Sequence, residues 1–144
     1  METSQIEKLD KARYNLVKWL TIGWALWFGT YILKDIVTEK MIILILIWLG
    51  LLGWTIFAIN LINFLKLKRE LKKDSKLQEA LNDELHRFNM YKSFVVGYWF
   101  LICTISILFG ITIFFRISTL IITEILLYIG VLSVLIASLF YNKD

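Results

Sequence analysis

The sequence has no proline, and only one cysteine and one histidine among its 144 residues. Without proline, no residue removes a backbone donor from a helix interior, so long unbroken helices are possible. Cys103 has no intramolecular partner for a disulfide, and its place in an apolar run predicts packing as a small hydrophobic side chain. A lone histidine, His86, excludes a metal or catalytic cluster that needs two, and we expect it to be exposed.

Charge is also scarce and unevenly distributed. Charged residues make up 19% of the chain, against about a quarter in a typical soluble domain, and 58% of residues are hydrophobic. Four long runs are uncharged or nearly so: Trp19–Leu33, Met41–Leu65, Ser93–Phe115 and Ile117–Tyr141. Because a bilayer core of about 30 Å needs roughly 20 apolar residues as a helix, each run predicts a transmembrane helix.

We therefore predict an all-α polytopic membrane protein, a single domain over residues 1–144 whose four transmembrane helices form two hairpins. The spans are expected at about 16–33, 42–65, 93–115 and 119–141. The first begins before Trp19 because Lys18 can extend its amine to the interface. The polar residues before this run, and the lack of a small-residue cleavage site after it, are not those of a cleaved signal, so it is expected to remain.

Local signals predict where the helices begin and end. Two capping boxes predict helix starts near residues 5 and 76: Ser4 with Glu7, and Ser75 with Gln78. The first helix should end near Leu33, and Thr38 is the expected N-cap of the second. Helices two and three should continue past the membrane as a helical hairpin over residues 66–92.

The distribution of Lys and Arg predicts the orientation in the membrane. Of the sixteen, thirteen lie in the N-terminal flank, the segment 66–92 or the tail, and three lie on the opposite side: Lys34, Lys40 and Arg116. Because cytoplasmic flanks are enriched in Lys and Arg, both termini and the segment 66–92 should be cytoplasmic. The high content of Ile, Lys and Asn favours a bacterial inner membrane.

The segment 66–92 carries a heptad-like stripe: Leu67, Leu71, Asp74, Gln78, Leu81, Leu85 and Phe88. One interpretation is a solvated hairpin that completes the bundle. The other is a cytoplasmic docking surface for a protein partner or a second copy. Its candidate docking residues are Leu81, Leu85, Phe88, Asp83, Glu84 and Arg87. The nearby lysines also lie where anionic headgroups of membrane lipids attract cations.

Within this segment, residues 82–93 read Asn-Asp-Glu-Leu-His-Arg-Phe-Asn-Met-Tyr-Lys-Ser. An acidic pair followed by Arg, Asn and Lys-Ser just before a membrane helix resembles small four-span bacterial membrane proteins of an uncharacterised family. The resemblance covers about a dozen residues. It implies the four-span fold and no particular activity.

Three polar residues are candidates for a role inside the membrane: Glu124, Asn60 and Asn63. An intramembrane carboxylate is costly, which makes it a functional candidate. We weigh three readings of Glu124: an interfacial residue paired with Arg116 or Lys40, a structural ion pair facing the bundle, or an ion or proton site. The two asparagines share one helix face and should make interhelical hydrogen bonds or contact headgroups.

Small residues at four-residue spacing allow helices to approach closely. The pairs are Ala25 with Gly29, Ser106 with Gly110, and Ser133 with Ala137. An aromatic stripe on the first helix is expected to pack against lipid or the bundle: Trp24, Trp27, Phe28 and Tyr31. Together with the stripe in the segment 66–92, these pairs predict a homodimer or higher homo-oligomer.

Chemical motifs are missing. The sequence has no glycine-rich phosphate loop, no Cys and His ligand set and no Ser-His-Asp arrangement, and its basic residues cluster as membrane topology requires. We therefore expect no enzyme, no cofactor, no metal and no nucleic acid. The leading hypothesis is a small integral membrane scaffold, accessory subunit or regulator; the alternative is an oligomeric ion channel or small transporter that uses Glu124.

Overall fold

The computed structural model describes residues 2–71 and 84–142, and the side chains of residues 7–69 and 87–142. The described residues contain four α-helices: α1 (Glu2–Ile36), α2 (Lys40–Leu71), α4 (Glu84–Phe114) and α5 (Thr119–Tyr141). Each helix contains a segment long and apolar enough to cross a membrane. The prediction of an all-α chain with four helices of membrane-spanning length is confirmed.

The ends of α1 differ from the prediction. The helix is already formed at Glu2, so Ser4 lies inside it and is not its N-cap. At the other end α1 continues to Ile36 rather than stopping near Leu33, and the backbone N–H of Val37 still donates to Leu33 O at 3.0 Å. A run of residues that neither break nor cap a helix extends it by about one turn beyond the apolar stretch.

The start of α2 is also shifted. The backbone N–H of Ile43 donates to Glu39 O at 3.0 Å, which is the first bond of the helix. The residue whose carbonyl accepts that first bond is the N-cap, so Glu39 takes the position predicted for Thr38. The second predicted capping box, Ser75 with Gln78, lies outside the described residues.

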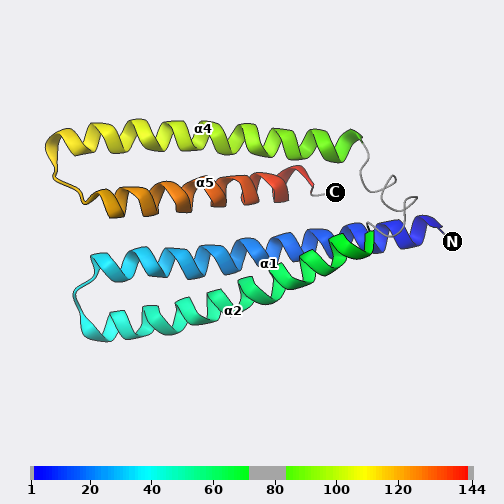
Figure 1. Ribbon diagram of the computed structural model, residues 1–144, viewed down its shortest axis with the longest axis horizontal. Coiled ribbons are helices and arrows are strands. Elements are labelled where there is room, and N and C mark those ends of the chain that lie inside the picture. Colours follow the sequence, from blue (N-terminus) through cyan, green and yellow to red (C-terminus); the bar gives the residue numbers. More distant parts are fainter. Residues whose placement is uncertain (1, 72–83, 143–144) are drawn as a thin grey trace.

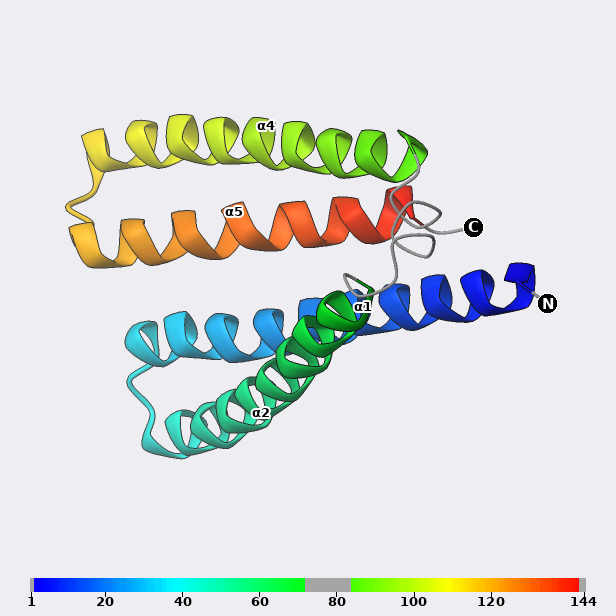
Figure 2. The ribbon, with the colours of Figure 1, turned by 45° about the vertical axis from the view of Figure 1, so that its right-hand side comes forward.

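The four helices lie side by side in the order α2, α1, α5, α4 (Figure 1). A view from a second direction gives the same order (Figure 2). The helix pairs in contact are α1 with α2, α4 with α5, and α1 with α5. The central pair is therefore α1 and α5, and α2 and α4 flank it on opposite sides. The connections 37–39 and 115–118 lie at one end of the row, which we call the connection end, and the termini at the other, which we call the terminal end.

The crossing of α1 and α2 depends on two glycines that face each other. A Cβ atom added to Gly23 would lie 2.6 Å from Phe57 N and 3.0 Å from Gly53 O. One added to Gly53 would lie 2.5 Å from Trp27 N. These are distances to backbone atoms, which cannot move aside as a flexible side chain can. The two helices therefore touch through their backbones, the close approach that small residues permit in membranes.

Few side chains in the described part of the chain are buried by protein, and most large apolar ones are exposed. This is what a lipid solvent requires, because the outside of the protein is as apolar as its inside. Buried hydroxyl groups bond to carbonyls of their own helix: Thr21 to Val17 at 2.8 Å, Thr30 to Leu26 at 2.6 Å and Ser93 to Asn89 at 2.8 Å. Such bonds satisfy polar groups where no water is available.

We predict that Gly53→Ala destabilises the protein. The new methyl group would overlap the backbone of α1, and overpacking of this kind costs about 1–3 kcal/mol. The thermal unfolding midpoint of the purified variant, measured in detergent or nanodiscs, should fall by several degrees.

Gly110→Ala is the matched control, because no atom lies within 4 Å of the position where its Cβ would stand. In an open helix position this change favours the helix by about 1 kcal/mol, so the midpoint should stay or rise. Equal midpoints for the two variants would show that the α1–α2 crossing tolerates a methyl group and that the close approach is not required.

Candidate functional site

Glu124 is buried on α5, with 8% of its surface exposed. Its Oε2 atom has no hydrogen-bond partner, and it forms no ion pair with any residue whose side chain is described. Arg116 and Lys40 are both exposed. The interfacial pairing of Glu124 with Arg116 or Lys40 is therefore wrong: the carboxyl turns into the protein, and the cations stay outside.

The contact between α1 and α5 forms around Tyr128, one helical turn after Glu124. The hydroxyl of Tyr128 donates to Ala25 O at 3.5 Å, and it would lie 3.1 Å from a Cβ on Gly29. The small pair Ala25 and Gly29 thus provides the space that Tyr128 occupies. Because residues four apart share a helix face, Glu124 and Tyr128 both lie on the side of α5 that meets α1.

Aromatic rings continue this contact toward α2. The Tyr128 ring stacks on Phe28, with centroids 6.3 Å apart, and Phe28 stacks on Trp24 at 5.0 Å. Trp24 in turn lies 5.6 Å from Phe57 of α2. Three residues of the predicted aromatic stripe of α1, Trp24, Trp27 and Phe28, therefore pack between helices, whereas Tyr31 is exposed. The indole N–H of Trp24 is buried without a partner among the described residues, as Glu124 Oε2 is.

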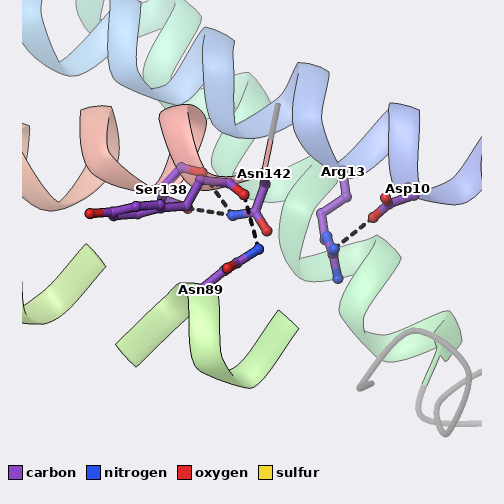
Figure 3. A network of polar contacts seen from close by, with 6 residues as sticks. Asp10, Arg13, Asn89, Ser138 and Asn142 are labelled. Carbon is purple, nitrogen blue, oxygen red and sulfur yellow. Dashed lines mark hydrogen bonds and ion pairs between the residues drawn. The ribbon is translucent and has the colours of Figure 1, made fainter. Parts of the chain in front are cut away.

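A second group of polar contacts lies at the terminal end of the row (Figure 3). The side-chain amide of Asn89, on α4, donates to Tyr141 O at the end of α5 at 2.9 Å. The amide of Asn142 donates to Ser138 O at 2.7 Å and closes the last turn of α5. Asn89 thus ties α4 to the C-terminal end of its neighbour, where helix carbonyls lack partners within the helix.

Basic residues border this group. Arg13, on α1, pairs with Asp10 one turn earlier at 2.6 Å (Figure 3). The Lys92 ammonium lies 4.3 Å from the Phe88 ring centre and 5.6 Å from that of Tyr141. A cavity of about 100 Å³ opens here between all four helices; its lining includes Arg13, Phe64 of α2, Met90 of α4 and Asn142. All four helices therefore contribute residues to this cavity, whose surface is mainly apolar.

The two asparagines predicted for α2 are placed differently. The side-chain amide of Asn60 donates to Ile56 O in the same helix at 2.8 Å, so the bond described for it is not interhelical. Asn63 is exposed. The asparagine that links two helices is Asn89, which sequence reasoning did not select.

The structure describes the predicted docking residues only in part. Phe88 is 53% exposed and Arg87 is exposed. The side chains of the other four candidates lie outside the described residues: Leu81, Leu85, Asp83 and Glu84. The side chain of His86 lies outside them as well. The continuous stripe therefore stays a prediction, with Phe88 as its described exposed member.

The remaining small residues divide into two groups. Ala137 is buried, and Ser133 lies 3.5 Å from a Cβ placed on Gly97, so this pair packs against α4. Ser106 is exposed, and the space around Gly110 is open to 4 Å. Cys103 is exposed too, so the small hydrophobic side chain predicted there lies on the outer surface of α4. These last three residues recur at helical spacing on one face of α4.

The described side chains include no group of three or more His, Cys, Asp or Glu that could hold a metal ion. The polar features that the described residues offer are one buried carboxyl on α5 and a group of polar contacts at the terminal end of the row. The sequence matches no family model, and comparison with curated proteins and with solved structures finds no match. The resemblance carried by residues 82–93 stays a prediction.

Sequence reasoning missed the residues that set helix contacts. Gly23 and Gly53 lie on different helices and belong to none of the four-residue pairs found in the sequence, and no sequence pattern selected Tyr128 or Asn89. A search for glycines within the apolar runs would have found Gly23 and Gly53, together with Gly29 and Gly50. Nothing in the chain marks Tyr128 or Asn89 before the helices are placed.

We predict that Asn89→Ala weakens the terminal end of the protein. The change removes the amide that bonds Tyr141 O, and a net hydrogen bond contributes about 0.5–1.5 kcal/mol. Thermal unfolding in nanodiscs should show a lowered midpoint. Asn63→Ala is the matched control, since that asparagine is exposed, and its midpoint should not change. A midpoint for Asn89→Ala equal to that of Asn63→Ala would contradict a structural role for this bond.

Proposed function

We propose that this protein is a small integral membrane scaffold, accessory subunit or regulator that acts by presenting helix faces to other membrane proteins. The observation that carries the proposal is the open row of helices. The outer helices α2 and α4 each have one neighbour in the central pair, and large apolar side chains along both of them are exposed, such as Trp48 and Phe109. A chain built this way has broad lateral surfaces and little enclosed volume.

The proposed topology is two hairpins with both termini in the cytoplasm of a bacterial cell. It is supported by the concentration of Lys and Arg at the terminal end of the row, because such residues mark the cytoplasmic flank. The same end would carry the cytoplasmic extensions of α2 and α4. The basic residues there, with exposed Phe88, are the proposed site for a protein partner and for anionic lipid headgroups.

The proposed first partner is a second copy of this chain, held through α4. Support comes from the exposed face that carries Cys103, Ser106 and Gly110, where nothing fills the space beside the glycine. Small residues let two helix backbones come close, and without a hydrophobic force between helices in lipid this close packing drives association.

Oxidation of membranes containing the protein should cross-link two copies through Cys103. In a parallel dimer packed on this face the two thiols come near each other, and a disulfide needs Cα atoms within about 7 Å. Non-reducing gel electrophoresis after copper-catalysed oxidation should show a band at twice 17.0 kDa. Gly110→Ile, which fills the open space, should reduce that band.

The control moves the thiol to another helix, as Cys103→Ser with Leu51→Cys on the exposed side of α2. This variant should give no dimer band under the same oxidation. Equal cross-linking from both positions would mean random collision in the membrane. A native mass of a single copy in mild detergent, well above micromolar concentration, would also count against a dimer.

A second candidate function, an oligomeric channel or small transporter, is favoured by the burial of Glu124. A channel or transporter requires a continuous water path, whereas Glu124 lies in a packed helix contact beside Tyr128. We expect liposomes containing the purified protein to show no flux of protons, alkali cations or chloride above that of empty liposomes. A flux that Glu124→Gln alters would favour the transporter instead of the scaffold.

A further inference from the structure

A groove of about 500 Å³ runs along the α4–α5 pair. On α4 it is lined by Val96, Phe100 and Thr104, and on α5 by residues between Ile129 and Tyr141. Ala137 is buried at its base, whereas the rings of Phe100 and Phe140 are exposed along its edges. This side of the two helices is therefore hollowed rather than flat.

Apolar side chains dominate the lining of this groove. Its two aliphatic hydroxyls each donate to a carbonyl of their own helix: Thr104 to Phe100 O at 2.8 Å and Ser133 to Gly130 O at 3.1 Å. Tyr141 supplies the remaining polar side chain, and it lies at the very end of α5. Burying polar groups against such a lining is costly, so the groove suits an apolar chain.

The groove has the depth of one membrane leaflet. From Ile129 to Tyr141 the axis of α5 rises roughly 18 Å. Half of a hydrocarbon core of about 30 Å is about 15 Å. Tyr141 lies at the terminal end, and tyrosines are enriched where a helix meets the membrane surface. The groove therefore extends from that surface to about the middle of the bilayer, as an acyl chain does.

The side chain of Lys92 lies at the terminal end of the groove. Its ammonium is 5.6 Å from the ring centre of Tyr141, which lines the groove, and 4.3 Å from that of Phe88. Aromatic rings at these distances attract a cation and hold it in place. One row at four-residue spacing on α4 continues from this lysine into the lining: Lys92, Val96, Phe100 and Thr104.

The Lys92 ammonium has no negative partner in the protein, as far as the side chains of residues 7–69 and 87–142 are concerned. The carbonyls at the end of α5 are bonded by amides instead. Tyr141 O accepts from Asn89 at 2.9 Å, and Ser138 O accepts from Asn142 at 2.7 Å. The positive charge is therefore available to an anion from outside the protein.

The groove between α1 and α2 provides a comparison. Its volume is about 510 Å³, its lining is also mainly apolar, and Lys34 belongs to that lining. There, however, the lysine ammonium pairs with Asp35 at 3.5 Å. Of these two grooves, only the one between α4 and α5 combines an apolar lining with a cation that no described carboxylate balances.

We propose that the α4–α5 groove binds one anionic phospholipid from the leaflet at the terminal end, with an acyl chain along the groove and the headgroup phosphate at the Lys92 ammonium. An unbalanced cation near the membrane surface attracts anionic lipids, whereas phosphatidylcholine carries a cation of its own. The inference rests on the attraction of anionic headgroups proposed above for the terminal end, and it assigns that attraction to one groove and one lysine.

Native mass spectrometry of the full chain in detergent micelles tests the headgroup. The micelles contain equal amounts of phosphatidylglycerol and phosphatidylcholine with identical acyl chains. We expect one retained phosphatidylglycerol per chain, favoured at least about fivefold, the factor that one lysine close to an anionic headgroup contributes. Lys92→Gln should remove this preference. Lys66→Gln, which changes an exposed lysine of α2 at the same end, is the matched control and should keep it.

The outcomes separate this proposal from the broader one. Equal retention of the two lipids by the wild type would overturn the groove and the headgroup attraction together. A preference that Lys92→Gln keeps, or that both lysine variants lose equally, would overturn the groove alone and assign the attraction to the basic surface as a whole. Neither result depends on the dimer, which Cys103 cross-linking decides.

A phosphatidylglycerol with a diazirine in one acyl chain locates that chain, using the full protein in phosphatidylcholine vesicles. Light expels nitrogen from the diazirine, and the carbene left inserts into a nearby C–H bond, so the peptide gains the lipid mass. We expect adducts in residues 96–104 and 129–141. Thr104→Phe, which fills the inner end of the groove, should reduce them severalfold. Thr55→Phe is the matched control, because Thr55 is an exposed threonine of α2 that bonds its own helix in the same way.

Adducts distributed equally over α2 and the α4–α5 pair would overturn the placement of the chain, since they would show lipid contact without a site. Equal adducts in Thr104→Phe and Thr55→Phe would do the same. If Thr104→Phe instead lowers the Cys103 dimer band and leaves the adducts unchanged, the occupant of the groove is a second copy of the chain and not a lipid.

Discussion

The packing of α1 against α5 is the interaction on which this arrangement depends, because it joins two pairs of helices into one row. Few side chains form this contact: Tyr128 of α5 lies over Ala25 and Gly29, and its ring stacks on Phe28. In lipid no hydrophobic force pushes helices together, so shape, ring stacking and hydrogen bonds must hold them. A contact this limited is sensitive to any change in polarity within it.

The length and apolarity of the four runs were enough to predict the four helices. Four runs of about 20 apolar residues can only be helices in a bilayer, because an irregular backbone there leaves its N–H and C=O groups without hydrogen bonds. Four such helices are found. Their order was not predictable. The lipid-facing and protein-facing sides of these helices are equally apolar, so no hydrophobic stripe indicates which face meets which neighbour. The backbone contact between α1 and α2 at Gly23 and Gly53 shows that the absence of a side chain can decide which helix faces meet, which the hydrophobic pattern cannot.

For the candidate site, the sequence predicted the residue, Glu124, but not the residues around it. Glu124 could be selected from the sequence because it is a charged residue inside an apolar run. An intramembrane carboxyl is a functional candidate, and the structure buries this one. Of the three interpretations of its surroundings, the pairing with Arg116 or Lys40 is wrong, because it assumed that charged residues at the same helix end meet in space. Asn60 and Asn89 show the same limit. Both are amides that could bond a neighbouring helix, but only Asn89, which faces the end of α5, does so, and helix placement decides this.

Different interactions hold the helices together at the two ends of the row. At the terminal end, Asn89 bonds the last carbonyl of α5 and Arg13 pairs with Asp10, so polar groups there are satisfied by protein. At the connection end the α1–α5 contact contains Glu124, which has no partner. The terminal end is therefore held by a polar bond between helices, whereas the α1–α5 contact relies on close packing and ring stacking.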